Sequence, residues 1–383
     1  MKSGKKRKNK LKILFFCSKF GGGGAEKNLL RVINNANFNK YEIHLALTRS
    51  GGNYENKIDR RTNVHHLNKD ISSSSLALFF SIFKLSKLIS KLSPDVVCSI
   101  MDPQNVVSLL SKRWSATKTK YLICCQNNPQ VSLDNDGIRG KVIAMLARKL
   151  YHSADGIICL CDGVGQMTLD YFGLDKEYKV IYNAGYDQGI SNIEDSVSSI
   201  TKSKPQKISL LAVGRLTKQK GFDLLLSAVK NLDFPFTLNI LGIGPDEQSL
   251  KAQAEKLAIS DRVHFLGFQS NPYYYYSNAD IFILSSRWEG FGNVITEAMI
   301  CGTAVVASDC DFGPREIIEH ERTGILFEPE NIDAMSEAIK KIALNEHLRD
   351  KIALNGLARA KDFSPIEISD KYFDFFDQII SLN

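Results

Sequence analysis

Long apolar runs are missing from this chain of 383 residues. No apolar stretch reaches the roughly 18 residues that a helix needs to cross a bilayer. The basic N-terminus also lacks the apolar core and cleavage site of a secretory signal, since the apolar residues that follow it are few and are needed as a strand. The apolar content of 44% is ordinary for a globular protein. We therefore expect a cytoplasmic protein.

The cysteines lack metal-binding spacing. They stand at positions 17, 98, 124, 125, 159, 161, 301 and 310, with no C-x-x-C pair among them. Most lie in apolar, strand-like runs, where free cysteines are usually buried and reduced. We expect structural thiols and no zinc site. The vicinal pair Cys124 and Cys125 is the one candidate for thiol reactivity.

A dinucleotide-binding fingerprint is also missing. Residues 12–17 predict a first strand, and the glycines at 21–24 form a turn before a helix predicted at 28–35. The pattern G-x-G-x-x-G needs a third glycine where the chain has Glu26 or Lys27. A nicotinamide or flavin oxidoreductase is therefore disfavoured. The four consecutive glycines still allow backbone amides to approach a ligand closely.

Positive charge is concentrated at the start of the chain. Residues 1–12 carry seven Lys and Arg and no acidic residue, within a formal net charge of +7. Residues 13–190 hold 22 basic against 15 acidic residues, whereas residues 191–383 hold 20 against 27. A basic first half suits an anionic membrane surface or an anionic acceptor, and we expect no nucleic-acid partner. The alternative is that residues 1–10 are only a solvated tail.

A helix predicted at residues 75–92 carries lysines on one face. Lys84, Lys87 and Lys91 recur at helical spacing after the apolar run at 76–80. A basic amphipathic helix can lie on anionic lipid, which would give the protein a peripheral position on the inner face of the membrane. The same pattern fits a helix that packs on a sheet and leaves its lysine edge in solvent, so both interpretations stand.

The most informative stretch is residues 285–308. The apolar runs around it, 281–284 and 304–307, are typical of buried parallel strands. Between them we predict a loop and one helix, with Asn293 as N-cap and a left-handed Gly302 after the helix. Such a unit places the loop and the helix N-terminus at the carboxyl edge of a sheet, where open α/β folds bind ligands.

This loop has the composition of an anion site flanked by acids. Gly290 and Gly292 have no Cβ, so the backbone can approach an anion closely, and the amides of the first helical turn favour negative charge. Glu289 in the loop and Glu297 in the helix lie on either side. Because carboxylates accept hydrogen bonds well from paired hydroxyls, the pattern indicates a phosphate between two polyhydroxy groups.

A second glycine loop supplies cations. The apolar run at 208–213 predicts a strand, and Gly214, Arg215 and Lys220 follow it before a helix predicted at 223–231. Two cations beside a helix N-terminus neutralise a diphosphate and stabilise the charge that it gains on leaving. Alone this spacing is a weak signal, because exposed Arg and Lys are commonly only solvated, but together with the paired acids Glu289 and Glu297 it indicates phosphate binding.

Together these segments resemble glycosyltransferase family 4, the retaining glycosyltransferases with the GT-B fold. The likeness rests on the acids Glu289 and Glu297, with seven residues between them, and on the segments 213–221, 241–244, 313–316 and 323–324. They follow one another in the order of the family and cover most of residues 206–330.

The resemblance implies an α/β protein of two Rossmann-like parallel-sheet domains that face across a cleft. It places the acceptor-side domain at 11–187 and the nucleotide-sugar domain at 206–364. A C-terminal helix at 365–383 is expected to pack back on the first domain. Residues 1–10 form the basic tail, and the Ser- and Lys-rich run at 187–207 is the expected linker.

The implied reaction is transfer of a hexose or N-acetylhexosamine, with retention, from a nucleoside diphosphate sugar to a lipid-linked or surface-polysaccharide acceptor. Uridine is the expected nucleoside. Glu289 would hold the donor sugar and Glu297 the ribose, while Arg215 and Lys220 replace a divalent cation, so no metal or other cofactor is expected. Glu289, Arg215 and Lys220 are the expected catalytic residues. The full donor set is Gly214, Arg215, Lys220, Glu289, Gly290, Phe291, Gly292, Asn293, Val294 and Glu297.

On the acceptor side, the turn with Gly23, Gly24 and Glu26 is similar to the Gly-Gly-x-Glu turn that faces the cleft in the family. Gln126 and Asn127 are the other candidates: Cys124, Cys125 and Gln126 stand where many relatives carry Ser-Glu-Arg or Ser-Glu-His, and Asn127 follows where the relatives have an Asn. That departure removes an expected charged group. A second hypothesis therefore stays open, namely a non-catalytic nucleotide-sugar or polysaccharide-binding protein that kept the fold.

Overall fold

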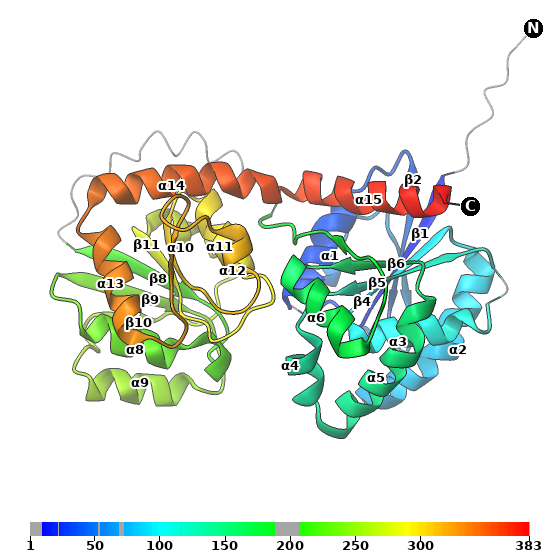
Figure 1. Ribbon diagram of the computed structural model, residues 1–383, viewed down its shortest axis with the longest axis horizontal. Helices are drawn as coiled ribbons and strands as arrows, with labels where there is room; N and C mark the ends of the chain where they lie inside the picture. The colour runs from blue at the N-terminus through cyan, green and yellow to red at the C-terminus, as the bar shows by residue number, and fades with distance from the viewer. Residues whose placement is uncertain are drawn as a thin grey trace, which may run out of the picture. The chain divides into compact units, whose positions relative to one another are not determined.

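The structure, a computed structural model, describes residues 10–21, 23–52, 54–68, 73–115, 117–187 and 207–382. The contacts divide the chain into two compact units, Met1–Ala184 with Pro365–Asn383 and Gly185–Ser364 (Figure 1). Residues 1–9 of the expected tail at 1–10, and residues 188–206 of the expected linker at 187–207, lie outside the described residues.

The first unit is built on a parallel sheet of strand order β3-β2-β1-β4-β5-β6-β7. Its strands are β1 (Leu11–Cys17), β2 (Tyr41–Leu47), β3 (Asn63–His66), β4 (Val96–Ile100), β5 (Lys120–Cys125), β6 (Gly156–Cys159) and β7 (Lys179–Val180). The central strands are mostly apolar and buried, β4 throughout and β1 from Ile13 onward, because helices cover the sheet.

The helices of this unit are α1 (Gly24–Asn34), α2 (Ser74–Leu92), α3 (Asp102–Lys112), α4 (Pro129–Asp134), α5 (Gly137–Leu150), α6 (Asp162–Phe172) and α15 (Pro365–Ser381). Helix α1 packs against α15, and α3 packs against both α2 and α5 (Figure 1). Phe373 and Phe376 of α15 join Phe15 of β1 in the core.

Helix α1 begins earlier than predicted. Its first residue is Gly24 rather than Asn28, and Gly23 is the N-cap. The Glu26 carboxylate accepts a hydrogen bond of 2.5 Å from the Gly23 amide. This contact satisfies an N–H at the helix end that would otherwise lack an intrahelical partner, so the end of the glycine turn is already helical.

The second unit is a parallel sheet of order β10-β9-β8-β11-β12-β13. Its strands are β8 (Ile208–Val213), β9 (Phe236–Leu241), β10 (Val263–Phe265), β11 (Ile281–Leu284), β12 (Ala304–Ser308) and β13 (Ile325–Phe327). Its helices are α8 (Phe222–Lys230), α9 (Glu247–Lys256), α10 (Tyr273–Asn278), α11 (Asn293–Ile300), α12 (Pro314–Ile317), α13 (Ile332–Ala343) and α14 (Glu346–Ala360). The predicted class, two Rossmann-like parallel α/β units, is confirmed.

In each sheet the order in which the strands are added reverses at the first strand. Strand β8 lies between β9 and β11, and β1 lies between β2 and β4. Open α/β sheets bind ligands outside the carboxyl ends of strands at such a switch point. In the second unit, the loops at this point are those after β8 and β11, which are the two ligand loops predicted from the sequence.

All eight cysteines are buried and free. Burial raises the pKa of Cys124 to about 12, and Cys125 beside it is also buried. A buried, protonated thiol is a poor nucleophile, so burial disfavours reactivity at this pair and agrees with the expectation of structural thiols. Separately, the helices of the described ranges include none with the length and apolarity to cross a membrane.

Candidate functional site

The loop after β8 packs closely on the loop after β9. The Gly214 amide donates to Leu241 O at 2.9 Å. Gly242 has a φ of 141°, and a Cβ there would lie 1.8 Å from Gly214 O, so only glycine fits. A Cβ on Gly214 would lie 3.3 Å from the stem of Lys220. The glycines thus bring the Gly214 backbone and the Lys220 side chain together.

The loop after β11 is tied to the loop after β8. Ser285 Oγ donates to Lys220 O at 2.8 Å. Arg287 makes two hydrogen bonds to the Asp223 carboxylate, of 2.9 and 2.7 Å, and a third to Lys218 O of 2.7 Å. The guanidinium holds the pKa of Asp223 below its usual value. This clamp, which is not among the predicted features, fixes the two loops side by side.

Glu289 and Lys220 form an ion pair within these loops. Lys220 Nζ lies 2.5 Å from Glu289 Oε1, and Ser286 Oγ donates to the same oxygen at 2.6 Å. An ammonium group has three donors, so Lys220 can hold Glu289 and still bind an anion. Both contacts use Oε1, and within the described ranges Oε2 has no partner. That second oxygen can accept from a ligand hydroxyl.

Arg215 lies in the same loop as Lys220. Its side chain is exposed, and no hydrogen bond or ion pair of the guanidinium occurs within the described part of the chain. The Lys220 side chain, by contrast, is largely buried. The two predicted cations therefore differ: one is fixed by Glu289 and the other can move to meet a ligand.

Helix α11 follows the β11 loop. Its first residue is Asn293 and its N-cap is Gly292, so the prediction of Asn293 as N-cap is wrong by one residue. The reason is that Gly292 has a φ of 89°, which glycine adopts without strain. Phe291 is buried against Phe363. The first turn of α11 includes Val294 and follows the loop that contains Gly290. Its backbone amides are therefore placed at a helix N-terminus, which is where an anion binds.

Glu297 is held by a tyrosine that is absent from the predicted site. Tyr276 OH donates to Glu297 Oε2 at 3.3 Å, and both side chains are buried. Burial, followed by the charge of Glu297, raises the pKa of Tyr276 well above its ordinary value, so the phenol remains a neutral donor. The two residues are 21 positions apart. A run of four tyrosines at 273–276 is the only hint of this contact in the sequence.

The predicted acceptor-side residues lie in the first unit. Gly23, Gly24 and Glu26 form the start of α1, after the carboxyl end of β1. Gln126 and Asn127 follow β5. The Nε2 group of Gln126 donates to Cys124 Sγ at 3.0 Å.

Gln126 and Asn127 differ in accessibility. Gln126 is buried, and its Oε1 atom has no hydrogen-bond partner within the described residues. Asn127 is exposed, with Nδ2 at 3.7 Å from Met101 Sδ. Met101 has a φ of 79°, a conformation that side chains rarely adopt. Backbone strain at Met101 and the unsatisfied oxygen of Gln126 thus lie at the carboxyl ends of the neighbouring strands β4 and β5.

No cluster of three or more His, Cys, Asp or Glu side chains suited to a metal ion occurs among residues that the structure describes. The chain does contain two Asp-x-Asp triplets, at 134–136 and 309–311. Asp309 of the second is paired with Arg315 at 3.0 Å. Metal independence therefore stays a prediction that rests on Arg215 and Lys220.

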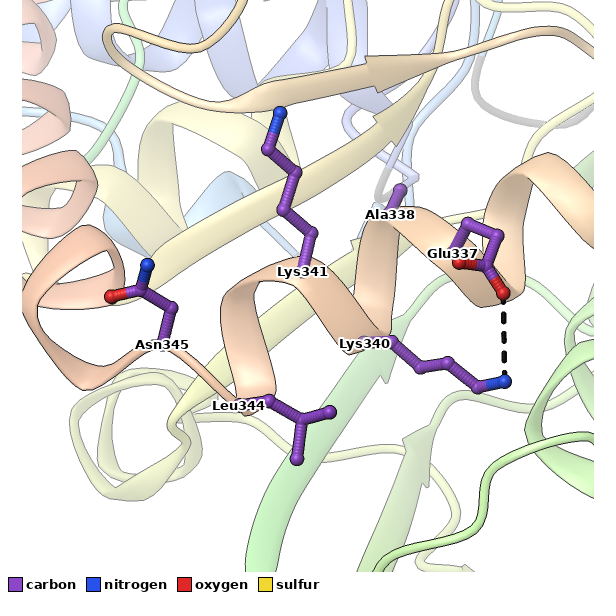
Figure 2. A pocket seen from close by; sticks show the side chains of 6 residues that line it. All are labelled: Glu337, Ala338, Lys340, Lys341, Leu344 and Asn345. Carbon is purple, nitrogen blue, oxygen red and sulfur yellow. Dashed lines mark hydrogen bonds and ion pairs between the residues drawn. The ribbon is translucent and has the colours of Figure 1, made fainter.

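A surface hollow lies along α13 and the start of the following turn (Figure 2). Its lining residues are Glu337, Ala338, Lys340, Lys341, Leu344 and Asn345. Lys340 pairs with Glu337 at 3.5 Å. None of the predicted site residues lines this hollow, so it has no part in the candidate site.

Comparison with known families covers most of the chain. Residues 22–184 match the family described as Glycosyltransferase Family 4. Residues 194–359 match the family described as Glycosyl transferases group 1. The two matches fall on the first and second structural units respectively.

Two curated relatives match over most of their length. One, from Campylobacter jejuni, is named N-acetylgalactosamine-N,N'-diacetylbacillosaminyl-diphospho-undecaprenol 4-alpha-N-acetylgalactosaminyltransferase. It is 29% identical over 94% of this chain and 97% of its own. The other is an uncharacterized glycosyltransferase of Methanocaldococcus jannaschii, which is 30% identical over 73% of this chain and 79% of its own.

Among solved structures, the fold is similar to HepE of Anabaena, crystallised in complex with UDP. The TM-score is 0.77 at 20% identity, and the match covers 96% of this chain and all of the other. At this level of identity the likeness establishes the fold.

Proposed function

This chain belongs to glycosyltransferase family 4, and we propose that it transfers a sugar from a UDP-sugar to a lipid-linked or surface-polysaccharide acceptor with retention of anomeric configuration. The observation that carries the proposal is the pair of loops after β8 and β11, which gathers Lys220 and Glu289 within 2.5 Å of each other. A cation and a carboxylate at one sheet edge suit a diphosphate joined to a sugar.

The donor is proposed to lie along the carboxyl edge of the second unit. Arg215 and Lys220 bind the diphosphate together with the amides at the start of α11. Glu297, oriented by Tyr276, accepts from the ribose hydroxyls. Glu289, oriented by Ser286, accepts from the hydroxyls of the sugar. Each side chain proposed to bind the donor is therefore oriented by a neighbouring residue, except Arg215, whose exposed side chain can move to contact the diphosphate.

These residues are proposed to act on the reaction electrostatically. In the transfer, the bond between the anomeric carbon and the diphosphate oxygen breaks, the acceptor oxygen bonds to that carbon and the hydroxyl proton is released. Negative charge grows on the departing diphosphate, and fixed cations in a partly desolvated site stabilise it. Lys220 is fixed already by Glu289. We propose that these two cations suffice without a divalent metal.

The acceptor is proposed from two considerations. The Campylobacter jejuni relative is named for transfer to a sugar on diphospho-undecaprenol. The first half of this chain also has an excess of basic residues, which suits the phosphates of a lipid-linked acceptor. Both considerations support a lipid-linked sugar as acceptor.

The test is release of UDP from a panel of UDP-sugars by the purified protein in EDTA, with and without lipid-linked acceptor. One donor should turn over in EDTA, and Glu289→Ala and Arg215→Ala should each lower kcat/KM by at least about a hundredfold. Lys256→Ala and Glu255→Ala remove charges from α9 on the same unit and should leave turnover unchanged.

Other outcomes count against specific parts of the proposal. Tight UDP-sugar binding without turnover of any donor would favour the non-catalytic binding protein. Activity that disappears in EDTA and returns with magnesium would contradict the metal-free site. Turnover with inverted configuration of the product would contradict retention.

A further inference from the structure

Helix α2 presents aromatic side chains to solvent. Leu76, Phe79, Phe80 and Phe83 are 45 to 57% exposed. Their spacing places them on one face of the helix. The opposite face, with Ala77, Leu85 and Ile89, is buried in the unit. The sequence predicted the lysines of this helix but not the outward direction of its phenylalanines.

Trp114 extends the same exposed surface. It follows α3, is 55% exposed, and its ring lies 5.4 Å from that of Phe83. Phe79 contacts both Phe80 and Phe83, at ring distances of 5.7 and 6.2 Å. We call Leu76, Phe79, Phe80, Phe83 and Trp114 the aromatic face. An exposed apolar surface of this kind marks a site of interaction with a membrane or another protein.

Helix α5 carries a second apolar stripe. Ile138, Val142 and Met145 lie at helical spacing and are 47 to 83% exposed. Helix α3 packs against both α2 and α5 (Figure 1). The two exposed stripes therefore belong to helices that flank α3.

The charged residues of α2 and α5 themselves have one sign, although Asp136, the N-cap of α5, pairs with Arg139 at 3.7 Å. Helix α2 contains Lys84, Lys87 and Lys91 and no acidic residue, and α5 contains four basic residues and no acidic one. Lys84 donates to Leu67 O and to Asn68 Oδ1, which leaves its charge uncompensated. Lys87 and Lys91 are exposed and form no ion pair with an acidic residue in the described ranges. Phenylalanines thus occupy the first half of α2 and lysines the second.

We propose that the aromatic face docks on a bilayer that contains anionic phospholipid, with the phenylalanines and Trp114 inserted at the headgroup level and Lys87 and Lys91 against lipid phosphates. Aromatic side chains and lysines together are typical of helices that lie in a membrane interface. Protein interfaces, in contrast, are depleted in lysine, so lysines beside phenylalanines favour lipid over a second protein. The inference goes beyond the proposed reaction, because it concerns a surface and needs no sugar donor.

The experiment is cosedimentation of the full chain with vesicles of phosphatidylcholine alone, or of equal parts phosphatidylcholine and phosphatidylglycerol. The wild-type protein should bind the anionic vesicles far more tightly. The triple variant Phe79→Ser, Phe80→Ser, Phe83→Ser should weaken this binding by about a hundredfold, and Lys87→Gln with Lys91→Gln by about twentyfold, in a salt-dependent manner. Because these side chains are exposed, circular dichroism should show folded variants.

The matched control is Leu344→Ser with Leu354→Ser, which removes two exposed leucines from the second unit and should leave binding unchanged. The basic tail is intact in every variant, so binding by the tail alone would appear as a triple variant that binds like the wild type. That result would overturn the proposal.

Trp114 offers a direct readout. The chain has two tryptophans, so Trp288→Phe leaves Trp114 as the only indole. Its fluorescence should shift to the blue on anionic vesicles and be quenched by brominated lipid. Two results would overturn the proposal. One is an unchanged Trp114 spectrum in a sample that sediments with vesicles. The other is concentration-dependent self-association, by analytical ultracentrifugation, that the triple variant abolishes.

Discussion

The carboxyl edges of the two sheets differ in how their polar side chains are held. In the second unit, Lys220, Glu289 and Glu297 each have a close partner, and the Arg287 clamp joins the loops. In the first unit, the buried Gln126 and Asn105 each have an oxygen without a partner within the described ranges. The loops of the second edge are tied to each other, whereas the first edge keeps two buried oxygens without a partner among the described residues.

This difference suggests that the two units bind their ligands in different ways. A nucleotide donor has a constant shape, so the site that binds it gains from loops fixed before binding. Unsatisfied groups and the strained Met101 store free energy that a ligand of the first unit can release. We therefore expect substitutions at the second edge to act through geometry, and substitutions in the first unit to act through charge and solvation.

The largest effect is expected where the loops of the second unit are closest. Gly242→Ala should lower the free energy of unfolding by more than about 3 kcal/mol, because the new Cβ would lie 1.8 Å from Gly214 O. Gly267→Ala is the control. Its φ of 66° is also positive, but nothing lies within 4 Å of its Cβ position. It should cost only about 1 kcal/mol. Urea unfolding measures both, and equal losses would contradict the tight loop packing.

A smaller effect is expected from Asp102 in the first unit. Burial raises the pKa of Asp102 to about 6 from the ordinary 3.8. The folded state therefore binds the proton more tightly than the unfolded state, and stability falls as the pH rises from about 4 through about 6, by up to about 3 kcal/mol.

Asp102→Asn should flatten this pH dependence. An Asn side chain keeps an oxygen to accept the 2.7 Å hydrogen bond from Tyr151 OH. From pH 4 to pH 7 the unfolding free energy of the wild type should fall by about 2 kcal/mol more than that of the variant. A loss of stability at the start of α3 would lower the variant equally at both pH values. Urea unfolding at the two pH values checks this. Parallel curves for the two proteins would show that Asp102 keeps an ordinary pKa.

The smallest effect is expected on the surface of the first unit. Asp377 of α15 pairs with Lys40 and accepts from Tyr41 OH at 2.9 Å. Asp377→Asn should lower the unfolding free energy by about 0.5 kcal/mol at low salt and less at high salt, because the pair is partly exposed. Asp374→Asn, an exposed acid on the same helix, should change nothing. A loss above about 2 kcal/mol would mean that this pair, rather than the aromatic core, holds α15 in place.

Much of the fold could be predicted because its signals are local. The buried strands around residues 285–308 are unbroken apolar runs, and the observed bounds of β11 are the predicted ones. Glycine and acid spacing likewise indicated the loops that contain Lys220 and Glu289. Helix starts were less accurate at α1 and α11, where glycine at the N-cap replaces the side-chain cap that sequence rules look for.

The rest depends on contacts between distant residues. The bond from Tyr276 to Glu297 and the clamp from Arg287 to Asp223 leave no periodic pattern. The exposure of the aromatic face could not be predicted from the sequence for a different reason. Phenylalanine is normally buried, so a helix with three exposed phenylalanines contradicts the rule by which helix faces are assigned from sequence. That kind of exception marks surfaces rather than cores.

Binding of UDP by isothermal titration calorimetry tests the central claim most directly. The account predicts that the wild-type protein binds UDP in EDTA, that Glu297→Gln weakens binding by at least about tenfold through the ribose hydroxyls, and that Glu255→Gln on α9 has no effect. Absence of UDP binding by the folded wild type, or equal affinity of Glu297→Gln and wild type, would contradict the assignment of the donor to the carboxyl edge of the second unit.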